Sequence, residues 1–296
     1  MLAVRMNEQT HPPTRHWLNL PGLRLQYLNW PGAPADAPVL LFCHGWLDLG
    51  AAWARVAPHF ALQFRTYSFD FRGMGRSTWQ RGGDYHFPDY VQDIAEVADH
   101  ISPDQPFYLV GHSMGGMASS LYVGTFPERT VKYVNIEGLG PPDVGVSIAP
   151  DRFRRWIGEH RKFRTKRPRP YDTVEDISAR LMKMYPRLAP EFARFLADEI
   201  SVRDGEGKVQ FAHDPVHKVM SPQPFNAEQA RSFWARITCP VLCIRGGESE
   251  YDRQRYEDRA ALFANGSYTV IPGAGHMVHY DQPELLAKTL GGFFSR

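Results

Sequence analysis

The stretch VGHSMGG, residues 110–116, places Ser113 between two glycines. The apolar run PFYLV precedes this stretch, and the helical pattern MGGMASSLYVGTF follows the serine. A serine on a tight turn between a buried strand and a helix matches the G-x-S-x-G nucleophile elbow. There the hydroxyl stands at a helix N-terminus, whose backbone N–H groups stabilise developing negative charge. We therefore predict that Ser113 is a nucleophile. Gly111 and Gly115 are needed because a side chain at either place would meet the neighbouring strand or helix.

A serine hydroxyl is a weak nucleophile unless a general base takes its proton. His276 is the candidate base, because it follows an apolar strand pattern and the Gly-rich turn PGAG and precedes the last predicted helix. A loop at this place can bring an imidazole over the serine. His279 lies closer to the helix and lacks small residues before it, so we expect it to pack beside the loop. Serine, histidine and an acid together predict acyl transfer to water.

The elements that must position these residues alternate between strands and helices. Short apolar or alternating runs predict strands at residues 16–20, 23–30, 38–45, 66–71, 106–113, 131–138, 239–247 and 267–276. Helical periodicity lies between them, at residues 53–62, 89–101, 114–126, 255–263 and from 283 onward. Continuous apolar strands suit a parallel sheet that is covered on both faces. We therefore predict an α/β fold with a wound, mostly parallel sheet.

The alternation of strands and helices stops after Gly140. The following segment predicts amphipathic helices at residues 149–164, 172–185 and 189–200, without buried strands between them. We expect residues 141–236 to form a helical cap, inserted into a core made of residues 1–140 and 237–296. An insertion where strands end would lie over the ligand site of such a sheet.

The composition excludes several classes of function. The net charge of +2 requires no nucleic-acid partner. No segment reaches the roughly 18–20 consecutive apolar residues of a membrane span, and the N-terminal sequence has no apolar core for a signal peptide. The three cysteines, Cys43, Cys239 and Cys243, predict reduced core thiols in a cytoplasmic protein. No cysteine or histidine spacing predicts a metal site, and no Gly-rich motif predicts a nucleotide cofactor.

Several motifs occur in series along nearly the whole chain: HGW at 44–46, DFRGMGRS at 70–77, GHSMGG at 111–116, VNIEGLG at 134–140 and GAGH at 273–276. In this order they resemble the α/β-hydrolase family, and most of all its kraken-type and related bacterial serine hydrolases. The resemblance implies an eight-stranded, mostly parallel sheet with helices on both faces and a cap. It also implies an oxyanion hole made by the backbone N–H groups of Trp46 and Met114. In the DFRGMGRS loop we expect Asp70 and Arg72 to form a structural charge pair.

The acid partner of the histidine departs from the usual family pattern. The family most often places an aspartate after the strand PVLCIRG, where this chain has Ser249. Glu248, Glu250 and Asp252 lie nearby and remain open as alternatives, with Glu250 the foremost of them. A second location in the family is the end of the strand after the nucleophile helix, which here carries Glu137. A carboxylate that closes an apolar strand is costly without a role, so we predict Glu137 as the acid.

These residues predict a serine hydrolase that cleaves a carboxylic ester or thioester through an acyl-enzyme and needs no cofactor. A serine at position 113 argues against haloalkane dehalogenases and epoxide hydrolases of this fold, which use an aspartate. Carbon–carbon bond hydrolysis and a non-catalytic ligand receptor remain alternatives. Residues 152–169 contain nine Lys and Arg against one Glu. This segment is either a solvated face or a docking surface for an acidic carrier protein or the phosphates of a thioester.

Overall fold

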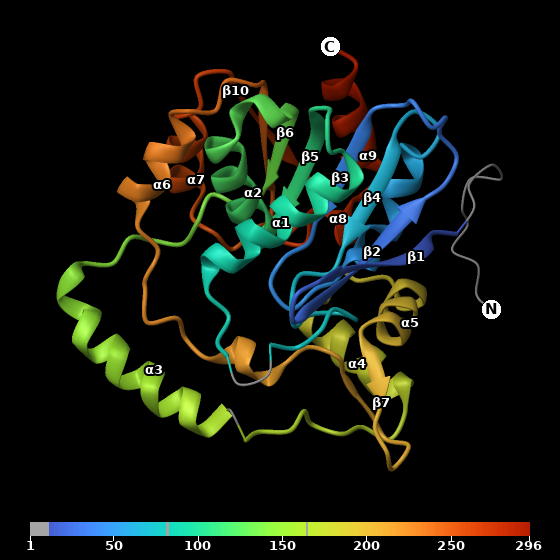
Figure 1. Cartoon of the computed structure of the whole chain (residues 1–296), viewed down its shortest axis with the longest axis vertical. Coiled ribbons are helices and arrows are strands. Elements are labelled where there is room, and N and C mark those ends of the chain that lie inside the picture. Colours follow the sequence, from blue (N-terminus) through green and yellow to red (C-terminus); the bar gives the residue numbers. More distant parts are fainter. Residues whose placement is uncertain (1–11, 81–82, 164) are drawn as a thin grey trace.

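The computed structural model describes residues 12–80, 83–163 and 165–296. They form an eight-stranded sheet in the order β1-β2-β4-β3-β5-β6-β9-β10, shown in Figure 1. The strands are β1 (Thr14–Leu20), β2 (Leu23–Trp30), β3 (Val39–Cys43), β4 (Arg65–Phe69), β5 (Phe107–His112), β6 (Thr130–Ile136), β9 (Val241–Gly246) and β10 (Gly266–Ile271). Strand β2 pairs antiparallel with β1 and β4, and the other pairs are parallel. The predicted strands and the mostly parallel sheet are thus confirmed. The prediction that the N-terminal sequence is no signal peptide concerns mainly residues 1–11, which lie outside the described residues.

Helices cover both faces of the sheet because its strands are apolar on both sides. In β3, Leu40 and Phe42 point to one core, whereas Leu41 and Cys43 point to the other. The second core lies under α1 (Phe87–Ile101), α2 (Met114–Thr125), α6 (Ala227–Trp234) and α7 (Arg253–Ala260). The first lies under η1 (Gly50–Arg55), η2 (Ala57–His59), α8 (Val278–Asp281) and α9 (Pro283–Phe294). This arrangement is the one that buries every face of a parallel sheet.

One predicted helix has a different form. Residues 53–62 do not make an α-helix, and the short 3-10 helices η1 and η2 occupy this region. Pro58 explains the break, because proline lacks the N–H for an α-helical bond and its ring would meet the carbonyl of residue 54. A further 3-10 turn, η3 (Pro127–Arg129), leads into β6.

The greater part of the segment between β6 and β9 lies beyond the ends of the sheet strands, at the bottom of Figure 1. It contains η4 (Val146–Ile148), α3 (Ala149–Phe163), α4 (Val174–Met184), α5 (Pro190–Glu199), β7 (Ser201–Arg203), β8 (Val209–Phe211) and η5 (Pro215–Lys218). Strands β7 and β8 form a small hairpin that the sequence did not predict, because three residues are too few for a period-2 pattern.

The end of the inserted segment returns to the core. Helix α6 packs on α2, and Trp234 is buried there with its indole N–H donating to Ser120 Oγ at 3.0 Å. We therefore propose that the cap ends before α6, near residue 226, rather than at 236.

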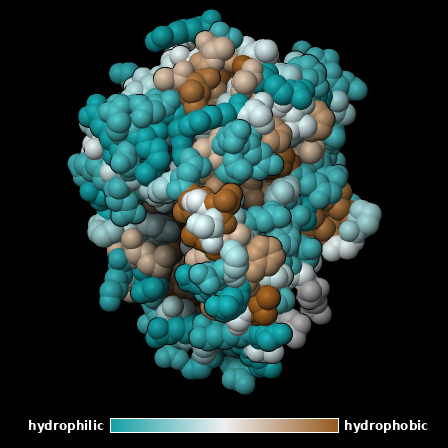
Figure 2. Space-filling model, turned by 90° about the vertical axis from the view of Figure 1, so that its left-hand side faces the viewer, coloured by the Kyte–Doolittle hydropathy of each residue, from teal (hydrophilic) through white to brown (hydrophobic). Residues whose placement is uncertain are grey.

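Helix α3 has no buried residue along its length. Phe153 and Ile157 on this helix are 47% and 41% exposed. The side of the molecule on which α3 lies faces the viewer in Figure 2, and it is mainly hydrophilic with a hydrophobic group near its centre. Over the described residues, none of the helices has both the length and the apolar character of a membrane span.

Candidate active site

Ser113 stands on a strained turn between β5 and α2. Its φ of 51° and ψ of −119° are unusual for a residue with a side chain, and its N–H donates to Ile136 O at 2.8 Å. The glycines on either side are required by close approach. A Cβ on Gly111 would lie 2.7 Å from Gly115 O, and one on Gly115 would lie 2.3 Å from His44 O. The turn therefore presses α2 against β5 on one side and against the end of β3 on the other.

The structure brings the three predicted residues of the triad together. Ser113 Oγ lies 3.0 Å from His276 Nε2, and His276 Nδ1 lies 3.3 Å from Glu137 Oε2. The Glu137 side chain is fully buried, whereas that of His276 is 20% exposed. The imidazole therefore has one nitrogen on the hydroxyl and the other on a carboxylate that water does not reach. This arrangement can take a proton from the serine and stabilise the resulting imidazolium.

Glu137 is held by two further donors. Its Oε1 accepts from Gly246 N–H at 2.7 Å, and its Oε2 accepts from Ser249 Oγ at 2.8 Å. Ser249 is the residue at the usual place of the acid in the family. In this chain it donates to the carboxylate of Glu137, the residue that follows β6. From the sequence, Ser249 was noted only because it stands where the family usually has an aspartate, and no role was predicted for it. The signal available was the pairing of a serine at the usual location with a glutamate at the alternative one.

The other three acids near this loop do not contact the imidazole. Glu248 pairs with Arg187, and Asp252 caps α7 by accepting from Arg255 N–H at 2.7 Å. Glu250 is exposed and lines a hollow beside His276, but the bond at Nδ1 goes to Glu137.

The HGW loop packs directly on the elbow. A Cβ on Gly45 would lie 2.9 Å from His112 Nδ1 and 3.2 Å from Ser113 Cβ, so only glycine fits. Trp46 follows it, with a half-exposed side chain whose indole N–H donates to His217 O at 3.3 Å in the cap. Met114 is the first residue of α2. The oxyanion role of the Trp46 and Met114 N–H groups stays a prediction.

The predicted charge pair of Asp70 and Arg72 is wrong. Buried Asp70 accepts from the backbone N–H groups of Gly50 at 2.7 Å and Arg76 at 2.8 Å, and burial raises its pKa to about 6. Arg72 instead pairs with Asp93 of α1 at 2.7 Å. The main-chain donors occupy the Asp70 carboxylate, so Arg72 turns outward from the loop to α1. Asp70 therefore braces the segment that leads from the HGW loop into η1.

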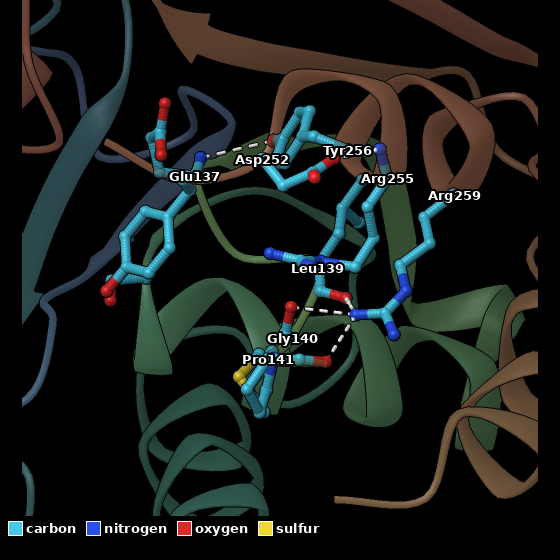
Figure 3. A pocket seen from close by; sticks show the side chains of 11 residues that line it. Glu137, Leu139, Gly140, Pro141, Asp252, Arg255, Tyr256 and Arg259 are labelled. Atoms are coloured by element: carbon cyan, nitrogen blue, oxygen red, sulfur yellow. Dashed lines mark hydrogen bonds between the residues drawn. The ribbon is translucent and has the colours of Figure 1, made fainter. Parts of the chain in front are cut away.

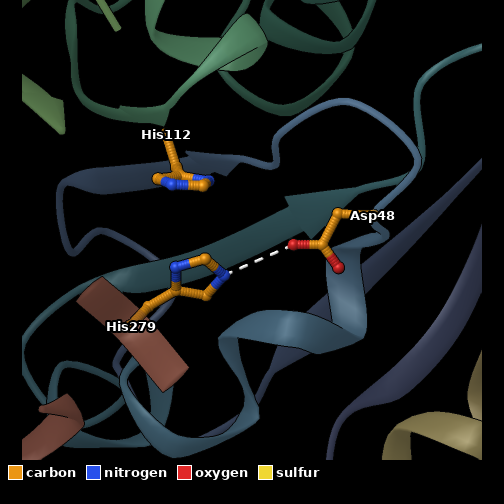
Figure 4. A group of neighbouring side chains, drawn as sticks. All are labelled: Asp48, His112 and His279. Atoms are coloured by element: carbon orange, nitrogen blue, oxygen red, sulfur yellow. Dashed lines mark hydrogen bonds and ion pairs between the residues drawn. The ribbon is translucent and has the colours of Figure 1, made fainter. Parts of the chain in front are cut away.

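His279, the alternative base, lies behind the site in a buried cluster with Asp48 and His112 (Figure 4). Its Nε2 lies 3.3 Å from Asp48 Oδ2, and its ring stacks on Trp53. Asp48 also accepts from the hydroxyl of Tyr280 at 2.7 Å. His279 therefore packs beside the loop, as predicted.

His112 connects this cluster to the main chain of His276, the predicted base. Its Nε2 lies 2.9 Å from the main-chain oxygen of His276, and burial lowers the pKa of His112 well below its ordinary value. A neutral ring can donate this bond while its Nδ1 stays unprotonated. Donor atoms of Asp48, His112 and His279 lie within 4.8 Å of one another, a set that would also suit a metal. The bonds from His112 to the His276 main chain and from His279 to Asp48 support the His276 loop, whereas Nδ1 of His112 and Nδ1 of His279 are buried with no hydrogen-bond partner among the described residues.

Two hollows flank the catalytic residues. The first, about 110 Å³, contains Ser113 and Met117 and is closed by Arg255 and Arg259 of α7 (Figure 3). In Figure 3, Arg259 donates to three successive carbonyls, those of Leu139, Gly140 and Pro141, at 2.7–2.8 Å. These bonds hold the chain that leaves β6 against α7. The second hollow, about 200 Å³, contains His276 and reaches Met184 and Tyr185 of the cap.

Comparison with known proteins identifies the family of this chain. The family model of the alpha/beta hydrolase family matches residues 40–289. The serine hydrolase-like protein of Danio rerio is 23% identical over 271 residues, 88% of this chain and 82% of the relative. The 3-hydroxybutyrate-oligomer hydrolase of Cupriavidus necator is 28% identical over 276 residues, 89% and 90% of the two chains. A crystal structure of a hypothetical protein from Pseudomonas aeruginosa PAO1 matches with a TM-score of 0.86 at 26% identity, covering 95% of this chain and 99% of that one. The predicted resemblance is confirmed, and the chain belongs to the alpha/beta hydrolase family.

Proposed function

We propose that this hydrolase cleaves a carboxylic ester or thioester through an acyl-enzyme on Ser113. The observation that carries the proposal is the continuous chain of contacts from Ser113 Oγ through His276 to Glu137, at 3.0 and 3.3 Å. The Cupriavidus necator relative is named as a hydrolase of 3-hydroxybutyrate oligomers, which supports hydrolysis of a small-molecule substrate by this protein as well.

In this mechanism His276 Nε2 takes the proton of Ser113 as Oγ attacks the carbonyl carbon. The carbonyl oxygen becomes an oxyanion, which the N–H groups of Trp46 and Met114 stabilise. The imidazolium then gives its proton to the departing alcohol or thiol, leaving the acyl group on Ser113. Water attacks this acyl-enzyme with His276 again as base, which releases the acid and restores the serine. Glu137 keeps a proton on Nδ1 throughout and stabilises the positive ring.

A fluorophosphonate probe and an ester assay test the proposal together. The probe should label the wild-type enzyme and not Ser113→Ala, which should also lose p-nitrophenyl ester hydrolysis. Ser232→Ala is the matched control, because Ser232 is an exposed serine on α6 that lies outside the site. Labelling or hydrolysis that survives in Ser113→Ala would place the nucleophile elsewhere. Comparing the ester with the matching thioester then decides between the two substrate classes.

A carrier-protein partner is a separate hypothesis for the outer face of α3. Arg161 and Lys162 are exposed there, whereas Arg155 pairs with Glu159. Arg164 of the same basic segment lies outside the described residues. Changing Arg161 and Lys162 to Glu should slow hydrolysis of a carrier-bound thioester and leave a small neutral ester unaffected. An equal effect on both substrates would make this a solvated face.

A further inference from the structure

A third and larger cavity, about 460 Å³, lies between the cap and the core. Trp46, Leu47 and Asp48 of the HGW loop line its core side. It shares Met184 and Tyr185 with the hollow that contains His276, so the two spaces adjoin. A substrate whose carbonyl sits at Ser113 beside the HGW loop can therefore extend one end into this cavity.

The cavity is lined by an unusual number of positive side chains. We refer to them as the cationic set, which consists of Lys166, Arg167, Arg169, Arg180 and Lys218. They come from the loop after α3, from α4 and from η5, so the fold gathers them from separate parts of the cap. The acid on the lining is Asp48, whose side chain is only 4% exposed and is occupied by His279 and Tyr280. The cavity therefore carries a strong excess of positive charge.

The described residues provide no carboxylate that pairs with any member of the cationic set. Other basic residues of the cap do find acids. Arg194 pairs with Asp198, and Lys208 pairs with Asp172. All five side chains of the cationic set are exposed to solvent, which screens their mutual repulsion. An anion that enters the cavity would nevertheless meet several cations and no competing free carboxylate. Burial lowers the pKa of Lys218, and the nearby charges of Lys166 and Arg180 lower it further.

Most of the remaining walls of the cavity are apolar or aromatic, and His213 also lines them. Leu196 of α5, Ile200 just after that helix and Phe211 of β8 contribute to them, together with Leu181 of α4. A space with apolar walls and positive groups suits a ligand that has an apolar stem and a negative end. Because the cationic set lies on the cap and Trp46 lies on the core, the two ends of such a ligand would be held by different parts of the fold.

We propose that this cavity binds the anionic end group, a carboxylate or a phosphate, of an ester or thioester substrate whose reacting carbonyl lies at Ser113. The inference rests on the proposed function and adds the class of substrate to it. The anionic end would form charge-assisted hydrogen bonds with the cationic set, and the apolar stem would lie along α5.

Matched substrates test this selectivity directly. Mono-p-nitrophenyl adipate and p-nitrophenyl hexanoate have the same acyl length and differ in a terminal carboxylate. We expect a higher kcat/KM for the adipate, and the preference should shrink in 0.5 M NaCl as salt screens the charges. In the double variant Arg180→Gln and Lys218→Gln, the adipate-to-hexanoate ratio should fall at least tenfold. The control variant Lys208→Gln, a paired cation outside the cavity, should keep the wild-type ratio.

A second pair of substrates distinguishes the two sources of charge. Hexanoyl-CoA carries phosphates on its leaving group, whereas the hexanoyl thioester of N-acetylcysteamine is neutral. A preference for the adipate that depends on Arg180 and Lys218 identifies a carboxylate, and a preference for the CoA ester that depends on them identifies phosphates. Either result supports the proposal. The proposal is overturned if neither preference exists. It is also overturned if every preference seen in the wild-type enzyme survives unchanged in the double variant.

Binding without turnover separates this inference from the proposed function. Monomethyl adipate should bind Ser113→Ala in calorimetry, and adding Arg180→Gln and Lys218→Gln should weaken that binding at least tenfold. If the wild-type enzyme hydrolyses p-nitrophenyl hexanoate but monomethyl adipate does not bind, only the cavity assignment fails. If monomethyl adipate binds as expected but no ester or thioester is hydrolysed, the anion site stands and the proposed reaction fails.

Discussion

Glu137→Gln should lower kcat by roughly 10²–10⁴ with little change in the fold. Glutamine has almost the shape of glutamate, but one carboxylate oxygen becomes an NH2 group. The side chain can then satisfy its neighbours in only one orientation. Its remaining oxygen must accept from Gly246 N–H, which the carboxylate binds at 2.7 Å, because two donors facing each other in a buried site are costly.

That orientation turns the new NH2 group toward His276 Nδ1 and Ser249 Oγ, both of which bond the same oxygen in the native chain. His276 must then accept at Nδ1, so its proton moves to Nε2, which lies 3.0 Å from Ser113 Oγ. An imidazole with a proton on Nε2 cannot take one from the serine. The loss corresponds to about 3–5 kcal/mol of transition-state stabilisation, at 1.36 kcal/mol for each factor of ten.

Steady-state hydrolysis of p-nitrophenyl hexanoate measures this effect, with thermal unfolding as the check on folding. Glu250→Gln is the matched control, because Glu250 is an exposed glutamate on the neighbouring loop. This substitution should lower kcat less than about tenfold, which corresponds to a barrier change below about 1.4 kcal/mol. Adding Ser249→Asp to Glu137→Gln should recover part of the activity, since residue 249 contacts the same oxygen as His276. A Glu137→Gln enzyme with wild-type kcat, or a larger loss in Glu250→Gln, would refute the assignment.

Three further changes are expected to have distinct effects. Ser249→Ala removes one donor from Glu137 and should lower kcat about fivefold, from a bond worth about 1 kcal/mol; no change would mean that Gly246 N–H alone orients the carboxylate. Gly45→Ala should lower kcat about 10²-fold, because its Cβ would push on His112 and Ser113 and shift the elbow; a fully active variant would contradict that close packing. His217→Gln should reduce acid sensitivity. Burial lowers the pKa of His217 to about 3, so the unfolded chain gains a proton below about pH 6.5 that the folded chain does not. The drop in unfolding free energy from pH 7 to pH 5, measured by denaturant titration, should then be smaller by about 2 kcal/mol.

The pattern of apolar runs was sufficient to predict the sheet. Strands buried on both faces are mainly apolar, as β3 is at every position, so their sequences reveal them without knowledge of their partners. The helical region around Pro58 was predicted wrongly, because periodicity alone overlooked a proline inside the turn. The hairpin of β7 and β8 was missed because its strands are too short to show alternation.

Ser113 and His276 could be predicted because local sequence determines the form of their turns. Gly111 is required by contacts within the turn, and Gly115 is required because the end of β3 lies against it. Both requirements appear in the sequence as the G-x-S-x-G motif. The acid was harder to predict, because the sequence offers four candidate carboxylates. Glu137 follows β6, whereas Glu248, Glu250 and Asp252 follow β9. Which of them meets the imidazole depends on the register of β6 beside β9 and on the path of the following loop, and these are properties of the folded sheet.

The sequence by itself therefore determined the elements and the turns that carry Ser113 and His276, since strand and helix patterns and the G-x-S-x-G motif can be recognised in neighbouring residues of the chain. Tertiary structure alone decided the relations between distant segments. It placed Ser249, after β9, within hydrogen-bond distance of Glu137, after β6, and it paired Arg72 with Asp93 rather than Asp70. It also placed positive side chains from separate segments around one cavity between the cap and the core. The physical reason is that hydrogen bonds and charge interactions act through space over a few ångströms, and only folding brings such partners within that range.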